Sequence, residues 1–146
     1  LLYPSDLHSF YRLSRPAPKK LVRDNSVEHM KSHGACVSSR VLSERELPYH
    51  LIEKLKEEAQ ELGQARTSSD QAEEMADICE ILEAYLALIG LSEEEVRKAR
   101  IKKKDNRGGF THGNFVEYIE VPEGSQYDVY CGKTPEKYQV REIEEA

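Results

Sequence analysis

The sequence predicts an all-α fold, a helical bundle, and three observations lead to this prediction. Two long segments place apolar residues three and four positions apart, which is the spacing of one face of a helix. Serine with glutamate three residues later, the capping box of a helix start, occurs in residues 43–46 and 92–95. A glycine follows each of the two apolar segments, as it does at the ends of many helices.

Four helices are expected along the chain, over residues 27–33, 43–62, 70–89 and 93–104. In the helix over 43–62, the predicted apolar face comprises Ile52, Leu55, Ala59 and Leu62. In the helix over 70–89, the apolar seam comprises Met75, Ile78, Leu82, Tyr85 and Ile89. Its 3-4-3-4 spacing is typical of a helix that packs in a bundle.

Two acidic clusters lie within these two helices. The first is Glu57-Glu58-Ala59-Gln60-Glu61, and the second is Glu73-Glu74-Met75-Ala76-Asp77. Each contains carboxylates at positions i and i+3, which lie on one face of a helix. Two such helices packed antiparallel would bring four carboxylates together, close enough to hold a divalent cation.

Four of these acids lie at the margins of the apolar faces: Glu58, Glu61, Glu74 and Asp77. Glu57 and Glu73 point away from the seams, and a solvated surface explains them. Ionised carboxylates beside a core repel one another, so protonation, a Lys or Arg partner, or a metal ion must compensate them. Because all four offer only oxygen, a metal there is expected to be Mg²⁺, or Mn²⁺, rather than zinc.

A basic segment follows the acidic helices and ends in Lys102-Lys103-Lys104, with Arg107 before a Gly-Gly pair. Arg107 can clamp a phosphate through two N–H groups, while paired glycines let the backbone approach a ligand. A cationic helix C-terminus, which stabilises the helix dipole by itself, is the alternative explanation. His112, just beyond this turn, is either a contact to phosphate or base, or a surface residue.

Composition excludes several classes of protein. The 146 residues suit one ordinary domain, and a net charge of −6 argues against a protein that coats a nucleic-acid polymer. The three cysteines form no CxxC pair, so neither a zinc site nor a disulfide framework is indicated and a reducing compartment fits. With no stretch near the ~20 apolar residues of a membrane span and no visible secretory signal, we expect a cytoplasmic protein that does not bind membranes.

The combination of motifs resembles the MazG-like all-α NTP pyrophosphohydrolase superfamily. EExxE over 57–61 is followed by EExxD over 73–77 on the next helix. Two flanking segments are similar to the phosphoribosyl-ATP pyrophosphohydrolase-like branch: Lys20-Leu21-Val22-Arg23-Asp24 near the start and Arg107-Gly108-Gly109-Phe110 after the fourth helix. The resemblance covers roughly residues 19–121.

The resemblance implies a helical bundle completed by dimerisation, as a homodimer or a higher homo-oligomer. It also implies Mg²⁺-dependent cleavage between the α- and β-phosphates of a nucleotide, which yields a nucleoside monophosphate and pyrophosphate. Carried over by position, the metal ligands are Glu58, Glu61, Glu74 and Asp77. The substrate-binding residues are Lys20, Arg23, Asp24, Lys102, Lys103 and Arg107. A carboxylate that is not fully engaged as a ligand would accept the proton of the attacking water, with Glu61 the first choice and Glu57 the second.

The chain also departs from the family pattern. Where the family commonly continues with Lys-Ile-Pro after the LVRD motif, this chain has Asn25-Ser26-Val27, so any role of that lysine is lost or moved. Residues 1–18 and 122–146 have no counterpart and are expected to be an N-terminal and a C-terminal extension. The C-terminal extension is predicted to be irregular or β-containing, with a small hairpin around Gly132-Lys133.

Three functions remain open at this point. The first is a nucleotide pyrophosphohydrolase that removes non-standard nucleoside triphosphates. The second is hydrolysis of phosphoribosyl-ATP in histidine synthesis. The third is a catalytically silent helical module that dimerises through the apolar seam and presents the acids as a charged surface.

Overall fold

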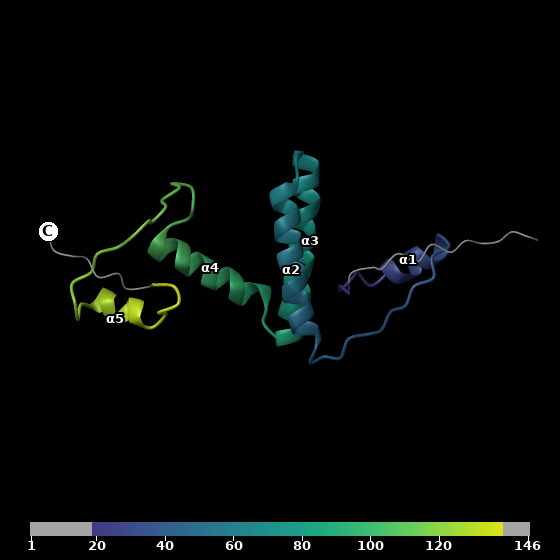
Figure 1. Ribbon diagram of the computed structural model, residues 1–146, viewed down its shortest axis with the longest axis horizontal. Helices are drawn as coiled ribbons and strands as arrows, with labels where there is room; N and C mark the ends of the chain where they lie inside the picture. The colour runs from purple at the N-terminus through teal and green to yellow at the C-terminus, as the bar shows by residue number, and fades with distance from the viewer. Residues whose placement is uncertain (1–18, 139–146) are drawn as a thin grey trace, which may run out of the picture. The chain divides into compact units, whose positions relative to one another are not determined.

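The computed structural model describes residues 19–138, and every regular element among them is a helix. Figure 1 shows these elements as α1 (Ser26–Ser32), α2 (Leu47–Gln64), α3 (Ser68–Ile89), α4 (Glu93–Arg107) and α5 (Gln126–Gly132). The prediction of an all-α protein is therefore confirmed. The extension over 1–18 and the last part of the C-terminal extension, 139–146, lie outside the described residues.

The chain divides into two compact units, the first ending at Lys102 and the second beginning at Lys103. The first unit contains α1, α2, α3 and most of α4, and the second contains α5. Among the helices described, none has the length and apolar character that crossing a membrane requires.

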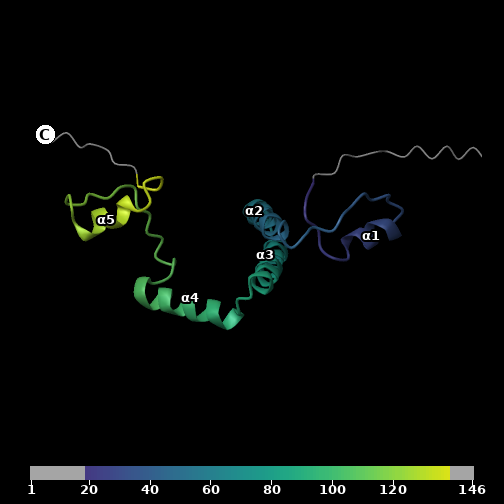
Figure 2. The ribbon, with the colours of Figure 1, turned by 90° about the horizontal axis from the view of Figure 1, so that it is seen from below.

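The centre of the first unit is a hairpin of α2 and α3, which lie side by side in both Figure 1 and Figure 2. Only residues 65–67 separate the two helices, so they run antiparallel. Positions equally far from this loop therefore face each other. Leu51 and Ile81, each 15 residues from Arg66, are the two buried apolar side chains of the hairpin.

Local side-chain chemistry explains where these helices begin and end. The Thr67 hydroxyl accepts a hydrogen bond from the backbone N–H of Asp70 and so caps α3. Gly90 ends α3 with φ +68, in the left-handed region that suits glycine. The predicted start of α2 at residue 43 is too early, because the helix begins at Leu47. Before it, the backbone N–H and the hydroxyl of Ser43 donate hydrogen bonds to Glu46 Oε2 and stabilise a turn. By contrast, Ser92 and Glu95 form the predicted reciprocal box before α4.

The predicted apolar face of α2 agrees only in part with the buried face, because Leu55 and Leu62 are half-buried but Ala59 is exposed. Leu51 is buried at 5% exposure, whereas its neighbour Ile52 is 37% exposed. The buried face continues seven residues later at Glu58, which is 3% exposed. Two turns of helix separate these positions, so an acid occupies a place where an apolar residue would ordinarily pack.

The apolar seam of α3 is largely uncovered within the described residues. Met75, Leu82 and Ile89 are 52%, 46% and 52% exposed, whereas Ile78 and Tyr85 are half-buried. α3 therefore has two apolar faces, one packed against α2 around Ile81 and one open to solvent.

In the second unit, the predicted β-hairpin around Gly132-Lys133 is wrong, because this part of the chain forms α5. Ser125 caps the helix by accepting a hydrogen bond from the backbone N–H of Asp128, and the Asp128 carboxylate accepts one from the N–H of Gly124. These reciprocal bonds are the chemistry of a helix start, and they outweigh the strand propensity of the tyrosines. Cys131 on α5 is buried.

The hydrogen bonds of Glu46 before α2 predict a contribution to stability that depends on pH. Hydrogen bonds from Arg40 and from the backbone and hydroxyl of Ser43 lower the pKa of Glu46 to about 2. A lowered carboxyl pKa stabilises the fold above the unfolded-state value, and this contribution is lost as the pH falls toward 2. Glu46→Gln is therefore expected to lower the melting temperature at pH 7 and to have a smaller effect at pH 3.

Circular dichroism melting of both proteins at the two pH values tests this. Glu44→Gln is the matched control, because the Glu44 side chain makes no hydrogen bond within residues 19–138. An equal difference in melting temperature at pH 7 and pH 3 would contradict the role assigned to Glu46.

Candidate metal centre and adjoining cavity

The register of the hairpin brings the two acidic clusters together. Glu58 on α2 and Glu74 on α3 each lie eight residues from Arg66, so they face each other two turns from the Leu51–Ile81 contact. Glu61 lies one turn beyond Glu58 on the same face of α2. The antiparallel packing expected from the sequence is therefore what the structure contains.

Three of the four predicted ligands converge. Carboxylate oxygens of Glu58, Glu61 and Glu74 all lie within 4.8 Å of one another. Glu58 is buried, Glu74 is half-buried and Glu61 is exposed, so the cluster opens from the interface of the helices toward solvent. Three hard oxygen donors at this spacing fit a Mg²⁺ or Mn²⁺ ion that keeps several waters.

Burial and the neighbouring acids together make ionisation of Glu74 less favourable. Its pKa is raised, first by desolvation, then by the hydrogen bond to Glu58 and by the charges of Glu61 and Glu58. A bound divalent cation would reverse this effect, because an opposite charge favours the ionised carboxylate. The cluster therefore has the electrostatic character of a cation site.

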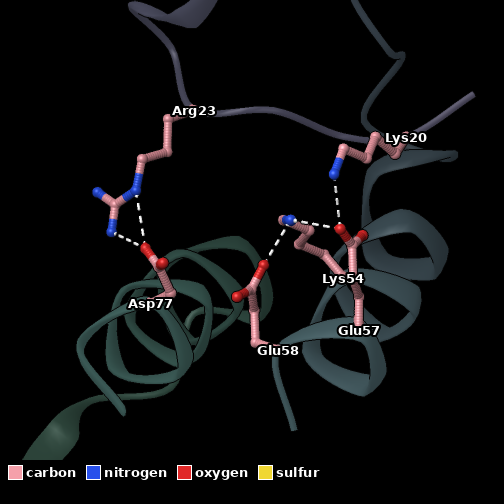
Figure 3. A network of polar contacts seen from close by, with 6 residues as sticks. All are labelled: Lys20, Arg23, Lys54, Glu57, Glu58 and Asp77. Atoms are coloured by element: carbon pink, nitrogen blue, oxygen red, sulfur yellow. Dashed lines mark hydrogen bonds and ion pairs between the residues drawn. The ribbon is translucent and has the colours of Figure 1, made fainter. Parts of the chain in front are cut away.

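Basic side chains pair with Glu57, Glu58 and Asp77, as Figure 3 shows. Lys54 Nζ lies 2.5 Å from Glu58 Oε1 and 3.1 Å from Glu57 Oε1. Lys20 Nζ donates to Glu57 Oε1 at 2.7 Å. The hydrogen bond from Lys20, together with those from Lys54, lowers the pKa of Glu57 although partial burial opposes the shift.

Asp77, the fourth predicted ligand, is engaged by a cation of the chain itself. Both Nε and Nη2 of Arg23 donate to its Oδ1, the former at 2.9 Å. Asp77 is not among the three carboxylates that converge within 4.8 Å. A metal-ligand role for Asp77 would require Arg23 to yield this oxygen, and that role stays a prediction.

A cavity of about 970 Å³ adjoins this network in the first unit. Residues 20–26, α1, α2 and α3 line it, and Glu58, Lys54 and Asp77 are on its wall. Apolar side chains form much of the remaining wall: Leu21, Val22, Met30, Leu47, Leu51, Ile81 and Ala84. The wall of the cavity thus combines apolar and charged side chains.

The predicted substrate-binding residues fall into two groups. Lys20, Arg23 and Asp24 line the cavity, and their part in substrate binding stays a prediction. The basic group at the end of α4 is exposed, and its part in substrate binding stays a prediction: Lys102, Lys103 and Arg107. His112 is also exposed. α4 continues three residues beyond its predicted end at residue 104, to Arg107, and Gly108 follows it with φ +77.

Lys54 was not predicted from the sequence. The signal was present, because Lys54 lies four residues before Glu58 and the i,i+4 spacing places both on one helix face. Many lysines have such a neighbour at the surface, however, and the burial of Glu58 is what distinguishes this pair.

The convergence of three carboxylates gives a ranking of metal ligands. We expect Glu61→Gln and Glu74→Gln to weaken Mn²⁺ binding about tenfold or more, the equivalent of ~1.4 kcal/mol. Asp77→Asn is expected to weaken it less, because Arg23 already occupies its Oδ1. Isothermal titration with Mn²⁺ measures these affinities.

Glu73→Gln is the matched control, since Glu73 is the exposed neighbour of Glu74 and lies outside the convergent set. Equal losses in Glu73→Gln and Glu74→Gln would show that the acids act only as a diffuse negative surface.

Comparison of the chain with protein-family models, with curated proteins and with solved structures found no match. The functional argument therefore depends on the hairpin, its acids and the adjoining cavity.

Proposed function

We propose that the chain is a Mg²⁺-dependent nucleoside triphosphate pyrophosphohydrolase, which cleaves between the α- and β-phosphates to give a nucleoside monophosphate and pyrophosphate. The observation that carries the proposal is the convergence of Glu58, Glu61 and Glu74 beside a cavity of about 970 Å³. The family resemblance of the two acidic motifs supports the same reaction. Removal of non-standard nucleotides is the proposed biological role.

The size and walls of the cavity suit a nucleotide. Ligand sites of ~300–1,000 Å³ with apolar walls and a few polar groups are typical of small-molecule binding. Here apolar side chains such as Leu21 and Met30 offer a surface for the base and sugar, and Lys20 and Arg23 offer cations for phosphates.

Glu58, Glu61 and Glu74 would hold the Mg²⁺ ion, which would neutralise phosphate charge and lower the pKa of an attacking water. Glu61 is the better candidate for the base that accepts the water proton, because no lysine or arginine pairs with it in the part of the chain described. Glu57 already binds Lys20 and Lys54, and these ion pairs occupy its Oε1. The second choice of base, Glu57, is therefore less suited to the role.

We further propose that the helical bundle is completed by self-association through the apolar seam. Met75, Leu82 and Ile89 present about half of their surface to solvent. Burying the exposed half of such a side chain contributes about 1 kcal/mol. A second copy of α2 and α3 has the complementary apolar face, as a symmetric dimer requires.

Two alternatives give different experimental results. Hydrolysis of phosphoribosyl-ATP would appear as pyrophosphate release from that substrate in preference to nucleoside triphosphates. A silent dimerisation module would self-associate but would bind neither Mn²⁺ at millimolar concentration nor nucleotide.

The proposed reaction predicts pyrophosphate release from a panel of nucleotides with Mg²⁺. Glu58→Ala and Asp77→Ala are expected to lower kcat/KM about a hundredfold or more, since the first removes a proposed ligand of the Mg²⁺ ion and the second removes the carboxylate that holds Arg23. Glu53→Ala is the control, because Glu53 lies on the same helix and pairs only with Lys56 at the surface. Full activity in both Glu58→Ala and Asp77→Ala would refute the mechanism.

Self-association is tested separately by sedimentation velocity. Leu82→Glu places a charge in the middle of the apolar seam and is expected to convert the dimer into a monomer. Glu83→Gln, at the adjacent exposed position, should leave the dimer intact. A wild-type chain that sediments as a monomer at all concentrations would contradict this part of the proposal.

A further inference from the structure

Lys54 differs from the other lysine of α2 that pairs within its own helix. Its side chain is 19% exposed, lies on the wall of the cavity and contacts both Glu57 and Glu58 (Figure 3). Lys56, two residues later, is 66% exposed and pairs with Glu53 at 2.6 Å. The two lysines therefore share a helix and the same kind of partner, but only Lys54 is held beside the acidic cluster.

Lys54 is a cation in this environment. Its ammonium group lies between two carboxylates, 2.5 Å from Glu58 Oε1 and 3.1 Å from Glu57 Oε1, and both favour its charged form. Its ammonium group contacts Oε1 of Glu58, which is also one of the three convergent carboxylates. A divalent cation at Glu58 and the ammonium of Lys54 must repel each other at this separation.

We propose that Lys54 is a built-in counter-cation, which competes with the divalent cation for Glu58 and, when displaced, binds a phosphate oxygen of the substrate. The first half rests on the contacts of Lys54 and on the candidate metal centre at Glu58. The second half rests on the proposed function.

The position of Lys54 favours this role over the other two cations of the network. Lys20 and Arg23 are 42% and 59% exposed, and they pair with Glu57 and Asp77 rather than with Glu58. When Glu58 turns to a divalent cation, Lys54 still has Glu57 on one side and the cavity on the other. A lysine ammonium is a compact point charge on a flexible stem, well suited to follow a phosphate oxygen.

The first half is tested with Mn²⁺ alone at pH 7.5, by isothermal titration. Lys54→Met removes the competing charge and is expected to tighten Mn²⁺ binding about three- to tenfold, as the loss of a nearby like charge should. Lys56→Met is the matched control and should bind Mn²⁺ as the wild type does. Lys54→Gln tests the same point should Lys54→Met fail to fold by circular dichroism, because its amide can still donate to Glu58. Mn²⁺ binding no tighter than in the wild type would overturn the proposal, since a purely structural lysine would produce no gain.

The second half is tested with a non-hydrolysable nucleoside triphosphate at saturating Mn²⁺. Lys54→Met should weaken nucleotide binding about tenfold, Lys54→Arg should restore it, and Lys56→Met should leave it unchanged. Tighter Mn²⁺ binding with unchanged nucleotide binding would refute the phosphate contact. A wild-type chain that binds Mn²⁺ but no nucleotide would refute the proposed function, while the Mn²⁺ measurements would still decide whether Lys54 competes for Glu58.

Discussion

The burial of Glu58 between α2 and α3 is the constraint on which the candidate site depends. A carboxylate at 3% exposure loses nearly all of its hydration, and an effective penalty of several kcal/mol is expected unless charges compensate it. Lys54, one turn earlier on the same helix, supplies one such charge. Glu74, which faces it across the hairpin, adds repulsion instead. The hairpin tolerates this arrangement because Leu51 and Ile81 pack two turns away.

Some acids of the site pair with basic side chains and others do not, and this difference divides the site into two sides. Lys20, Arg23 and Lys54 all line the cavity, and the last two pair with acids of its wall, Asp77 and Glu58. In the described part of the chain, no basic side chain pairs with Glu61 or Glu74. A divalent cation is therefore expected on the side of Glu61 and Glu74, and an anionic substrate on the side of the lysines and arginine. Glu58 belongs to both sides, because it converges with Glu61 and Glu74 and also pairs with Lys54.

The helices and their acidic clusters could be predicted from the sequence, but the contacts between segments far apart in the chain could not. The 3-4 spacing of apolar residues predicts α3 well, because long amphipathic segments leave few alternatives. It assigns Ile52 rather than Leu51 to the buried face of α2, since the two residues are equally apolar and only the register of the hairpin selects between them. The pairing of Arg23 with Asp77 spans 54 residues, and no local pattern encodes such a contact. The helix at Gln126–Gly132 was missed because its cap outweighs the strand propensity of its tyrosines.

The two faces of α3 link the stability of the hairpin to the proposed assembly. Consecutive residues of a helix differ by about 100° in direction, so Glu74 and Met75 necessarily belong to different faces. The face of Glu74 and Ile81 meets α2 and carries the acids, whereas the face of Met75, Leu82 and Ile89 is exposed. Among the described residues, Leu51 and Ile81 are the only buried apolar side chains of the hairpin, so its own hydrophobic core is small. A further layer on the exposed face would stabilise the hairpin without covering the acids, because the two functions occupy different sides of one helix.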